Sequence, residues 1–424
     1  MKPTIEVTVL GKPRFPSPIR RPVSDSLRLP EQILRDPQAS PPAEGLLFEL
    51  AGPRAELFFD PKQTRAGIVT CGGLCPGLND VIRSLFLQLH HAYGVKEVLG
   101  FRGGYQGLDP ARGAEPIVLT PEFVDGIHQQ GGTVLGTSRG PVDMGLAVDN
   151  LIRRGVNIVF TIGGDGTQRG GNALFQEAKT RGHALAVVGI PKTVDNDVAF
   201  VARTFGYLTA VEEAAKVLDC AHTECHSVHN GISLVKLMGR EAGFIAAGAA
   251  IASQDVNFVL VPEVPFKLEG DRGFLATLKT RVLKRRHALI VVAEGAGQHL
   301  LDSRDERDAS GNLKLRDIGL YLRQRIEAFF KSENIPITFR YFDPSYLIRS
   351  VPADAEDAIL CDLFARNAVH AAMAGRTGVV IGLLHDTFVH LPIELLAGRH
   401  KRLDPNDPAW HAVLAATGQP ARFE

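Results

Sequence analysis

The sequence predicts an α/β protein of two lobes, each with a mostly parallel sheet covered by helices. Two observations predict this fold. Short aliphatic runs alternate with amphipathic helical segments along most of the chain, and glycine-rich or polar loops directly follow several of these runs. Continuous apolar strands separated by helices are typical of parallel sheets buried on both faces. In such sheets ligands bind where strands end, so we expect an active site in a cleft at the strand carboxyl ends.

Seven aliphatic runs are the expected strands of two Rossmann-like lobes. They are AGIVTC (66–71), NIVFTIGG (157–164), LAVVGIPK (185–192), GISLVKLMG (231–239), FVLVPEV (258–264), HALIVVAEG (287–295) and GVVIGLL (378–384). Amphipathic helices are expected between them, over residues 79–94, 209–222 and 315–332.

Residues 1–63 differ from the rest of the chain. They are rich in Pro and Arg and have weak periodicity, which predicts an extension that wraps or caps the body or is partly mobile. We expect two α/β lobes, over residues 64–230 and 231–400, and a C-terminal tail over 401–424.

Composition excludes several classes of protein. Lys plus Arg and Asp plus Glu both number 47, so no net charge favours binding to nucleic acid or an anionic membrane. No apolar run is long enough for a membrane span and the N-terminus lacks a signal-peptide core, so we expect a cytoplasmic protein. The five cysteines fit reduced thiols better than a disulfide framework. The stretch CAHTECHSVH (220–229) matches no standard zinc spacing, and a helix end is the favoured interpretation over a metal site.

The first strand-end loop is TCGGLCPGLNDVIR (70–83). Its glycines allow a close backbone approach to an anion, and the following helix offers free N–H groups. A tight turn that needs glycine explains this loop equally well.

In the second loop, FTIGGDGTQRGG (160–171), Asp165 lies between glycines. A carboxylate there can hold Mg²⁺ while backbone amides hold phosphate. The structural alternative makes Asp165 a helix cap, but a cap rarely needs four glycines around it.

The third loop places Lys192, Thr193, Asp195 and Asp197 at the end of the buried strand AVVGIP. Charges in that position are costly unless they bind or catalyse. The two aspartates share one side if the segment is extended, so one could accept a proton from a hydroxyl while the other positions a neighbour or a metal-bound water. The alternative is an Asx-rich turn with Lys192 as a solvated partner.

GGDGT, PKTVDND, TFGYLTAVEEA and KLMGREAGFIA, in this order, resemble the phosphofructokinase A family over most of the chain from Ala66 onward. Within that family the chain resembles the atypical plant- and trypanosome-like branch, in which Gly166 and Lys192 occur together. The resemblance implies a 6-phosphofructokinase that uses ATP, fructose 6-phosphate and Mg²⁺, usually as a homodimer or homotetramer. NAD kinase and diacylglycerol kinase relatives share GGDGT but lack the other elements at these separations.

The resemblance also implies that residues 64–230 form the donor-phosphate and magnesium-binding lobe and that residues 231–400 form the sugar-phosphate-binding lobe. It implies roles for individual residues as well. Asp195 is the expected base for the C1 hydroxyl, Thr193 helps hold the transferring phosphoryl group, and Asp165 binds Mg²⁺. The expected ATP-binding residues are Gly73, Arg139, Gly140, Gly164, Asp165, Gly166 and Thr167. The expected fructose 6-phosphate residues are Thr193, Val194, Asp195, Met238, Gly239, Arg240, Glu294, Arg340, Tyr346 and Arg349.

Two positions depart from well-known bacterial members, which have an arginine at the position of Gly231 and a histidine at that of Tyr346. Arg340 and Arg349 are the cations available to replace that phosphate contact.

The phosphoryl donor depends on Gly166 and Lys192. Pyrophosphate users of the family usually combine an aspartate at the first position with a lysine at the second, whereas standard ATP users have glycine at both. Gly166 leaves room for the α-phosphate of a nucleotide, so ATP is the expected donor. A pyrophosphate-dependent enzyme is the alternative, and a non-catalytic sugar-phosphate-sensing relative is a remote one.

Overall fold

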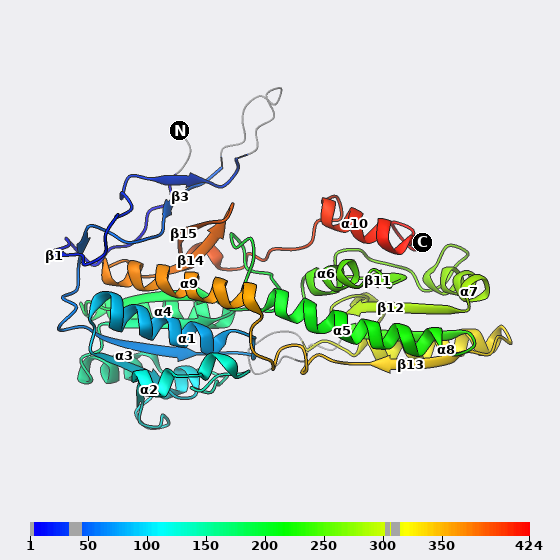
Figure 1. Ribbon diagram of the computed structural model, residues 1–424, viewed down its shortest axis with the longest axis horizontal. Coiled ribbons are helices and arrows are strands. Elements are labelled where there is room, and N and C mark those ends of the chain that lie inside the picture. Colours follow the sequence, from blue (N-terminus) through cyan, green and yellow to red (C-terminus); the bar gives the residue numbers. More distant parts are fainter. Residues whose placement is uncertain (1–3, 34–44, 302–305, 307–313) are drawn as a thin grey trace. The chain divides into compact units, whose positions relative to one another are not determined.

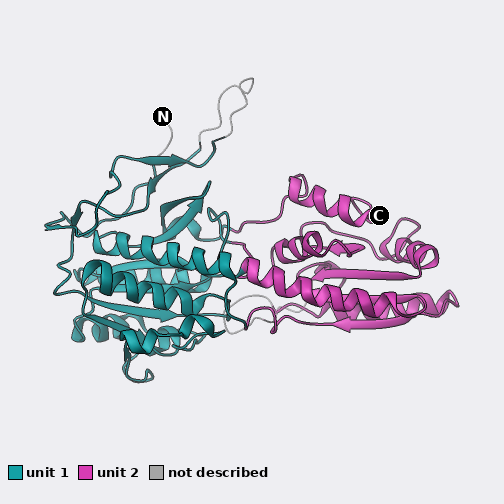
Figure 2. Ribbon diagram, viewed as in Figure 1, with its two compact units in different colours: residues 1–193, 198–206, 351–399 teal, residues 194–197, 207–350, 400–424 magenta. Residues whose placement is uncertain are grey.

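The computed structural model describes residues 4–33, 45–301, 306 and 314–424 (Figure 1). The part of the N-terminal extension over 1–3 and 34–44 lies outside the described residues. The chain forms two compact units (Figure 2): residues 1–193, 198–206 and 351–399 make unit 1, and residues 194–197, 207–350 and 400–424 make unit 2.

Unit 1 contains a nine-stranded sheet among its described residues, in the order β2-β3-β15-β14-β9-β8-β5-β6-β7. The strands β14, β9, β8, β5 and β6 pair in parallel, and the outer pairs are antiparallel. Their bounds are β2 (Arg28–Pro30), β3 (Leu47–Leu50), β15 (Thr387–Pro392), β14 (Val379–Leu384), β9 (Ala186–Pro191), β8 (Ile158–Gly163), β5 (Arg65–Thr70), β6 (Glu97–Phe101) and β7 (Ile117–Val118). A separate antiparallel pair joins β1 (Phe15–Pro16) to β4 (Glu56–Leu57).

Unit 2 contains a parallel sheet of four strands among its described residues, in the order β11-β12-β10-β13. The strands are β11 (Phe258–Leu260), β12 (His287–Ala293), β10 (Gly231–Leu237) and β13 (Thr338–Phe342). Buried aliphatic and aromatic side chains from these strands and from the helices beside them form one core cluster.

Helices cover both sheets. In unit 1 they are α1 (Leu78–Leu87), α2 (Pro121–Val124), α3 (Met144–Arg153), α4 (Asp165–Thr180) and α9 (Ala355–Met373), with the short turns η1 (Gln88–Tyr93), η2 (Gly104–Leu108), η3 (Ile127–Gln129) and η5 (Ile393–Leu396). In unit 2 they are α5 (Tyr207–His226), α6 (Phe244–Ser253), α7 (Phe274–Arg285), α8 (Ile318–Ser332) and α10 (Pro408–Thr417), with η4 (Gln298–Leu300). Within the described ranges, no helix combines the length and apolar character that crossing a membrane requires.

The structure confirms an α/β fold with mostly parallel sheets and covering helices. Each of the seven expected strands is present. The units differ from the expected lobe boundaries, because residues 351–399 return to unit 1 and residues 400–424 belong to unit 2. This return places β14 beside β9, where both strands bury their side chains. The sequence has no local signal for such a long-range pairing.

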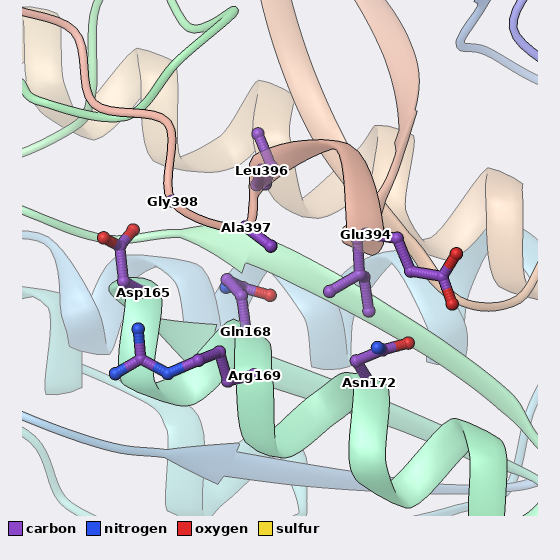
Figure 3. Close-up of a pocket in the computed structure, with 9 residues that line it drawn as sticks. Asp165, Gln168, Arg169, Asn172, Glu394, Leu396, Ala397 and Gly398 are labelled. Carbon is purple, nitrogen blue, oxygen red and sulfur yellow. The ribbon is translucent and has the colours of Figure 1, made fainter.

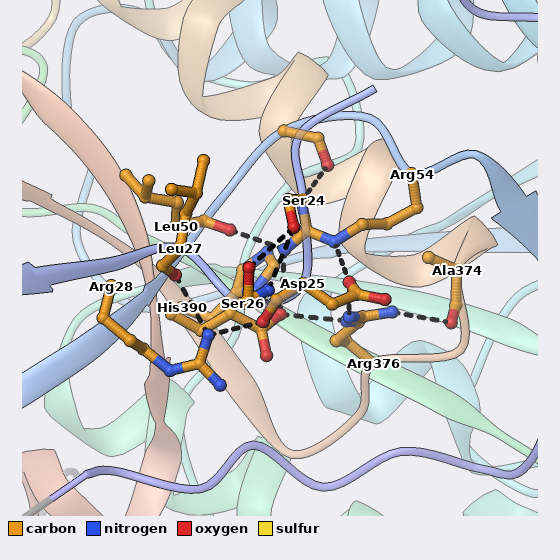
Figure 4. A network of polar contacts seen from close by, with 12 residues as sticks. Ser24, Asp25, Ser26, Leu27, Arg28, Leu50, Arg54, Ala374, Arg376 and His390 are labelled. Carbon is orange, nitrogen blue, oxygen red and sulfur yellow. Dashed lines mark hydrogen bonds and ion pairs between the residues drawn. The ribbon is translucent and has the colours of Figure 1, made fainter. Parts of the chain in front are cut away.

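Buried charges join the N-terminal extension to the rest of unit 1 (Figure 4). The Glu49 carboxylate, on β3, accepts hydrogen bonds from Arg54 (2.9 Å), Arg376 (3.1 Å) and His390 (2.9 Å). Burial alone would raise the pKa of Glu49, but the bond from His390 and the nearby arginines outweigh it and hold this pKa well below its usual range. Asp25, which is exposed, pairs with both arginines.

Glu49→Gln should lower the free energy of unfolding of the protein by about 2 kcal/mol at pH 7, because two buried arginines lose a charged acceptor. Urea unfolding at several pH values measures this. Since the pKa of Glu49 is depressed, its stabilisation is present above the unfolded pKa of about 4.3 and decreases as the pH falls, so the difference should shrink in acid. Asp25→Asn is the matched control and should cost less, because that carboxylate is exposed. Equal losses in the two variants would contradict the assignment.

Candidate active site

Three loops that the sequence predicts to carry chemistry leave one edge of the unit 1 sheet. The strands β5, β8 and β9 are parallel neighbours, with Thr70 paired to Ile162 and Gly163 paired to Pro191. The loops after these residues therefore begin side by side at the carboxyl ends of the strands.

In the second loop, the helix α4 begins at Asp165 and its N-cap is Gly164. The alternative interpretation of Asp165 as the helix cap is therefore wrong. The carbonyl of Gly164 accepts hydrogen bonds from the N–H groups of Thr167 (2.8 Å) and Gln168 (3.0 Å). A side chain at position 163 would lie 2.0 Å from the Thr167 hydroxyl, so this glycine is required by packing. At Gly166 a β-carbon would meet only the Arg169 guanidinium, at 3.8 Å, which leaves this position open.

A small open cavity lies beside α4 (Figure 3). Asp165, Arg169 and Asn172 line it on the helix side, and residues of the segment 393–398 line it on the other. One carboxylate on a helix N-terminus fits Mg²⁺, which keeps several waters and takes its remaining ligands from substrate phosphates. The described residues hold no group of three or more acidic, His or Cys side chains placed to bind a metal by themselves.

Lys192 connects the first loop to the second. It is 5% exposed, its backbone N–H donates to the Gly163 carbonyl (3.2 Å), and its ammonium donates to the Gly73 carbonyl (2.5 Å). The interpretation of Lys192 as a solvated turn residue is therefore wrong. The ammonium group of Lys192 lies at the first glycine-rich loop, beside Gly73.

Arg139 and Gly140 lie exposed in the segment that follows Gly136. The Thr137 hydroxyl in that segment donates to the Gly72 carbonyl (2.7 Å), which attaches the segment to the first glycine loop. Unit 1 thus brings together the expected ATP-binding residues on adjoining loops.

The turn after Thr193 belongs to unit 2 and is bent, in contrast to the extended segment that the sequence suggested. Asn196 has a φ of 55°, in the left-handed region that asparagine tolerates better than most residues. The neighbouring Asp195 is 8% exposed. Burial, followed by the negative charges of Asp197 and Glu294, raises the pKa of Asp195 well above the usual range, while Arg240 opposes the rise. A carboxyl of this kind is suited to accept a proton near neutral pH.

The expected sugar-binding residues of unit 2 meet where β10 and β12 end. The N–H of Glu294 donates to the Leu237 carbonyl (2.9 Å), and the N–H of Gly295 donates to that of Gly239 (3.0 Å). Burial raises the pKa of Glu294, and the cations Arg240 and Lys236 oppose this effect. The Arg349 guanidinium lies 4.9 Å from the centre of the Tyr346 ring, which is 74% exposed.

Position 231 cannot hold the arginine of bacterial members. A β-carbon at Gly231 would lie 2.0 Å from the Cys225 carbonyl oxygen. Arg340, on β13, is exposed and its guanidinium lies 3.5 Å from the Glu224 carboxylate. Its ion-pair partner is thus Glu224, and both side chains are exposed.

Sequence reasoning missed Lys236. Its ammonium lies 2.8 Å from the Asp317 carboxylate and 2.9 Å from that of Asp343, which links β10 to the start of α8 and to the end of β13. Asp343 also accepts from the Ser345 hydroxyl (2.6 Å), next to Tyr346. A single cation within the apolar run GISLVKL was the signal that could have identified it.

The chain matches the family model described as phosphofructokinase over residues 65–372. It is 47% identical to an ATP-dependent 6-phosphofructokinase of Borreliella burgdorferi, over 94% of this chain and 91% of the relative. It is also 47% identical to an ATP-dependent 6-phosphofructokinase of Trypanosoma brucei brucei (88% and 76%). The solved pyrophosphate-dependent phosphofructokinase of Marinobacter aquaeolei has the same fold, with a TM-score of 0.70 at 19% identity over 84% of this chain and 91% of that one.

Proposed function

The chain belongs to the phosphofructokinase family, and we propose that its ATP-dependent 6-phosphofructokinase activity resides in the residues described above. The enzyme transfers the γ-phosphoryl group of ATP to the C1 hydroxyl of fructose 6-phosphate. The observation that carries the assignment is the 44–47% identity to ATP-dependent relatives over nearly the whole chain, together with an intact Asp165 and Asp195.

The donor phosphates bind at the carboxyl edge of the unit 1 sheet. Backbone amides at Gly73 and at residues 164–166 face the phosphate oxygens, and Arg139 adds a cation. Members of this family generally use Mg²⁺. Asp165 would hold the Mg²⁺ ion, and the bound ion would neutralise phosphate charge. Phosphoryl transfer needs mainly positioning and charge neutralisation, which these groups supply.

Asp195 accepts the proton of the C1 hydroxyl as that oxygen attacks, and Thr193 hydrogen-bonds the transferring group. Arg240 and Glu294 bind the sugar, and Arg349 with Tyr346 binds its 6-phosphate. Arg340 is a further cation for the 6-phosphate, from an exposed position.

A donor comparison tests the function. Purified protein with fructose 6-phosphate and Mg²⁺ should form fructose 1,6-bisphosphate with ATP and far less with pyrophosphate, measured by coupled assay. Turnover with pyrophosphate alone would overturn the choice of donor. Thermal stabilisation by fructose 6-phosphate with no turnover on either donor would instead favour a sensing protein.

Arg349→Ala should raise the KM for fructose 6-phosphate by about 10- to 150-fold and leave the KM for ATP unchanged. One charged hydrogen bond to phosphate is worth about 1.5–3 kcal/mol. Steady-state kinetics with each substrate varied measures the split. Arg323→Ala, on α8 of the same unit, removes an exposed arginine and is the matched control. Equal weakening of both substrates would indicate a structural role for Arg349.

We also propose a homodimer or homotetramer and a cytoplasmic location. Two Arabidopsis thaliana relatives, at 46% and 44% identity, are chloroplastic enzymes, so members of this family work in more than one compartment.

A further inference from the structure

The first residues after position 400 contact the turn that carries Asp195, although the sequence assigned them to a tail. The backbone N–H of Lys401 donates to the Asp197 carbonyl (2.8 Å). Its ammonium donates to the Asn196 side-chain oxygen (2.9 Å). Lys401 therefore hydrogen-bonds to both residues that follow Asp195, namely Asn196 and Asp197. All of these residues belong to unit 2.

The turn needs such support. Asn196 is 6% exposed and has left-handed backbone angles, a conformation that costs free energy outside glycine and persists only where the surroundings fix it. The Lys401 bond fixes the orientation of the Asn196 side chain. The backbone bond to Asp197 fixes the exit of the turn.

Lys401 is itself anchored. Its ammonium lies 5.1 Å from the centre of the Phe244 ring, at the first residue of α6. Two residues later, the N–H of Leu403 donates to Glu263 (2.9 Å), and the same carboxylate accepts from the N–H of Gly243 (3.0 Å). The segment 401–403 thus connects the Asp195 turn to the loop that begins with Met238–Arg240.

We propose that Lys401 is a positioning residue of the phosphoryl transfer, which fixes the turn that presents Asp195 to the sugar hydroxyl. The inference rests on the proposed function, since it takes Asp195 as the base. It makes Lys401, which the sequence assigned to a tail, a supporting residue of the site.

The test compares Lys401→Met with Arg402→Met. Arg402 is the adjacent cation, is mostly exposed and pairs with Glu241, so its loss should leave kcat near the parental value. Lys401→Met should lower kcat by about 10- to 100-fold, the scale expected when a catalytic group is misplaced by about 1 Å, with little change in either KM. Lys401→Arg, which keeps a cation, should recover part of the loss.

Asn196→Gly provides an independent variant. Glycine adopts the left-handed turn without strain, so this change removes chiefly the acceptor of Lys401. Asn196→Gly should therefore reproduce the loss in kcat, even if Lys401→Met fails to fold. When both changes are combined, the loss in activation free energy should be smaller than the sum of the two single losses. Additive losses, parental kcat in Asn196→Gly, or a Lys401→Met variant equal to Arg402→Met in kcat would overturn the proposal. A parent enzyme inactive with both donors would overturn the proposed function instead.

Discussion

Asp195→Asn should lower kcat by about 10²- to 10⁴-fold, the contribution of a general base. Asparagine keeps the shape and the hydrogen-bonding oxygen of the side chain but cannot accept the proton. Binding of fructose 6-phosphate, measured by calorimetry, should stay close to that of the parent. Near-parental kcat at neutral pH would show that another group accepts the proton.

The same variant should be at least as stable as the parent at pH 7. The pKa of Asp195 is raised above its unfolded value, so at neutral pH unfolding is favoured by release of the proton that the folded state holds on this carboxyl. This cost to stability disappears as the pH falls below the unfolded pKa of about 3.9. Thermal melting at pH 7 and pH 4 measures the difference. A large fall in Tm would mean that the activity loss reflects misfolding. In the parent, activity should rise with pH well above the range in which an ordinary aspartate titrates.

Gly166→Asp should lower kcat/KM for ATP by about 10²-fold or more. A new carboxylate about 4 Å from a phosphate charge costs about 4 kcal/mol near a protein surface, and Arg169, whose guanidinium lies 3.8 Å from the added β-carbon, offsets part of this cost. The open space at Gly166 means that the change should not disturb folding.

Gly166→Ala is the control for the Gly166→Asp variant, because it adds a β-carbon without a charge. It should retain most ATP activity, since the added carbon meets the surrounding atoms only at ordinary contact distance. Equal losses in the alanine and aspartate variants would show that space, and not charge, determines the effect. Full ATP activity in Gly166→Asp would remove this position from donor selection.

The sequence by itself determined the strands and the identity of the chemical loops. The strands β5, β8 and β9 are buried on both faces, so an unbroken aliphatic run specifies each one locally. Asp165 and Asp195 are recognisable because a charge directly after such a run has no structural reason to be there. The family follows from the order of these motifs and the donor from Gly166 beside Lys192, and the relatives confirm both.

The tertiary structure decided the contacts that hold those loops in place. Lys192 donates to Gly73, Lys236 pairs with Asp343, and Lys401 donates to Asn196, over separations of 119, 107 and 205 residues. Nothing local distinguishes such a lysine from a solvated one, because its partner is set by how the strands pair. The same holds for Glu49 and His390, whose buried bond exists only because β3 and β15 are neighbours in the sheet. Local periodicity specifies a strand, but hydrogen bonds between distant segments form only once the whole sheet is assembled.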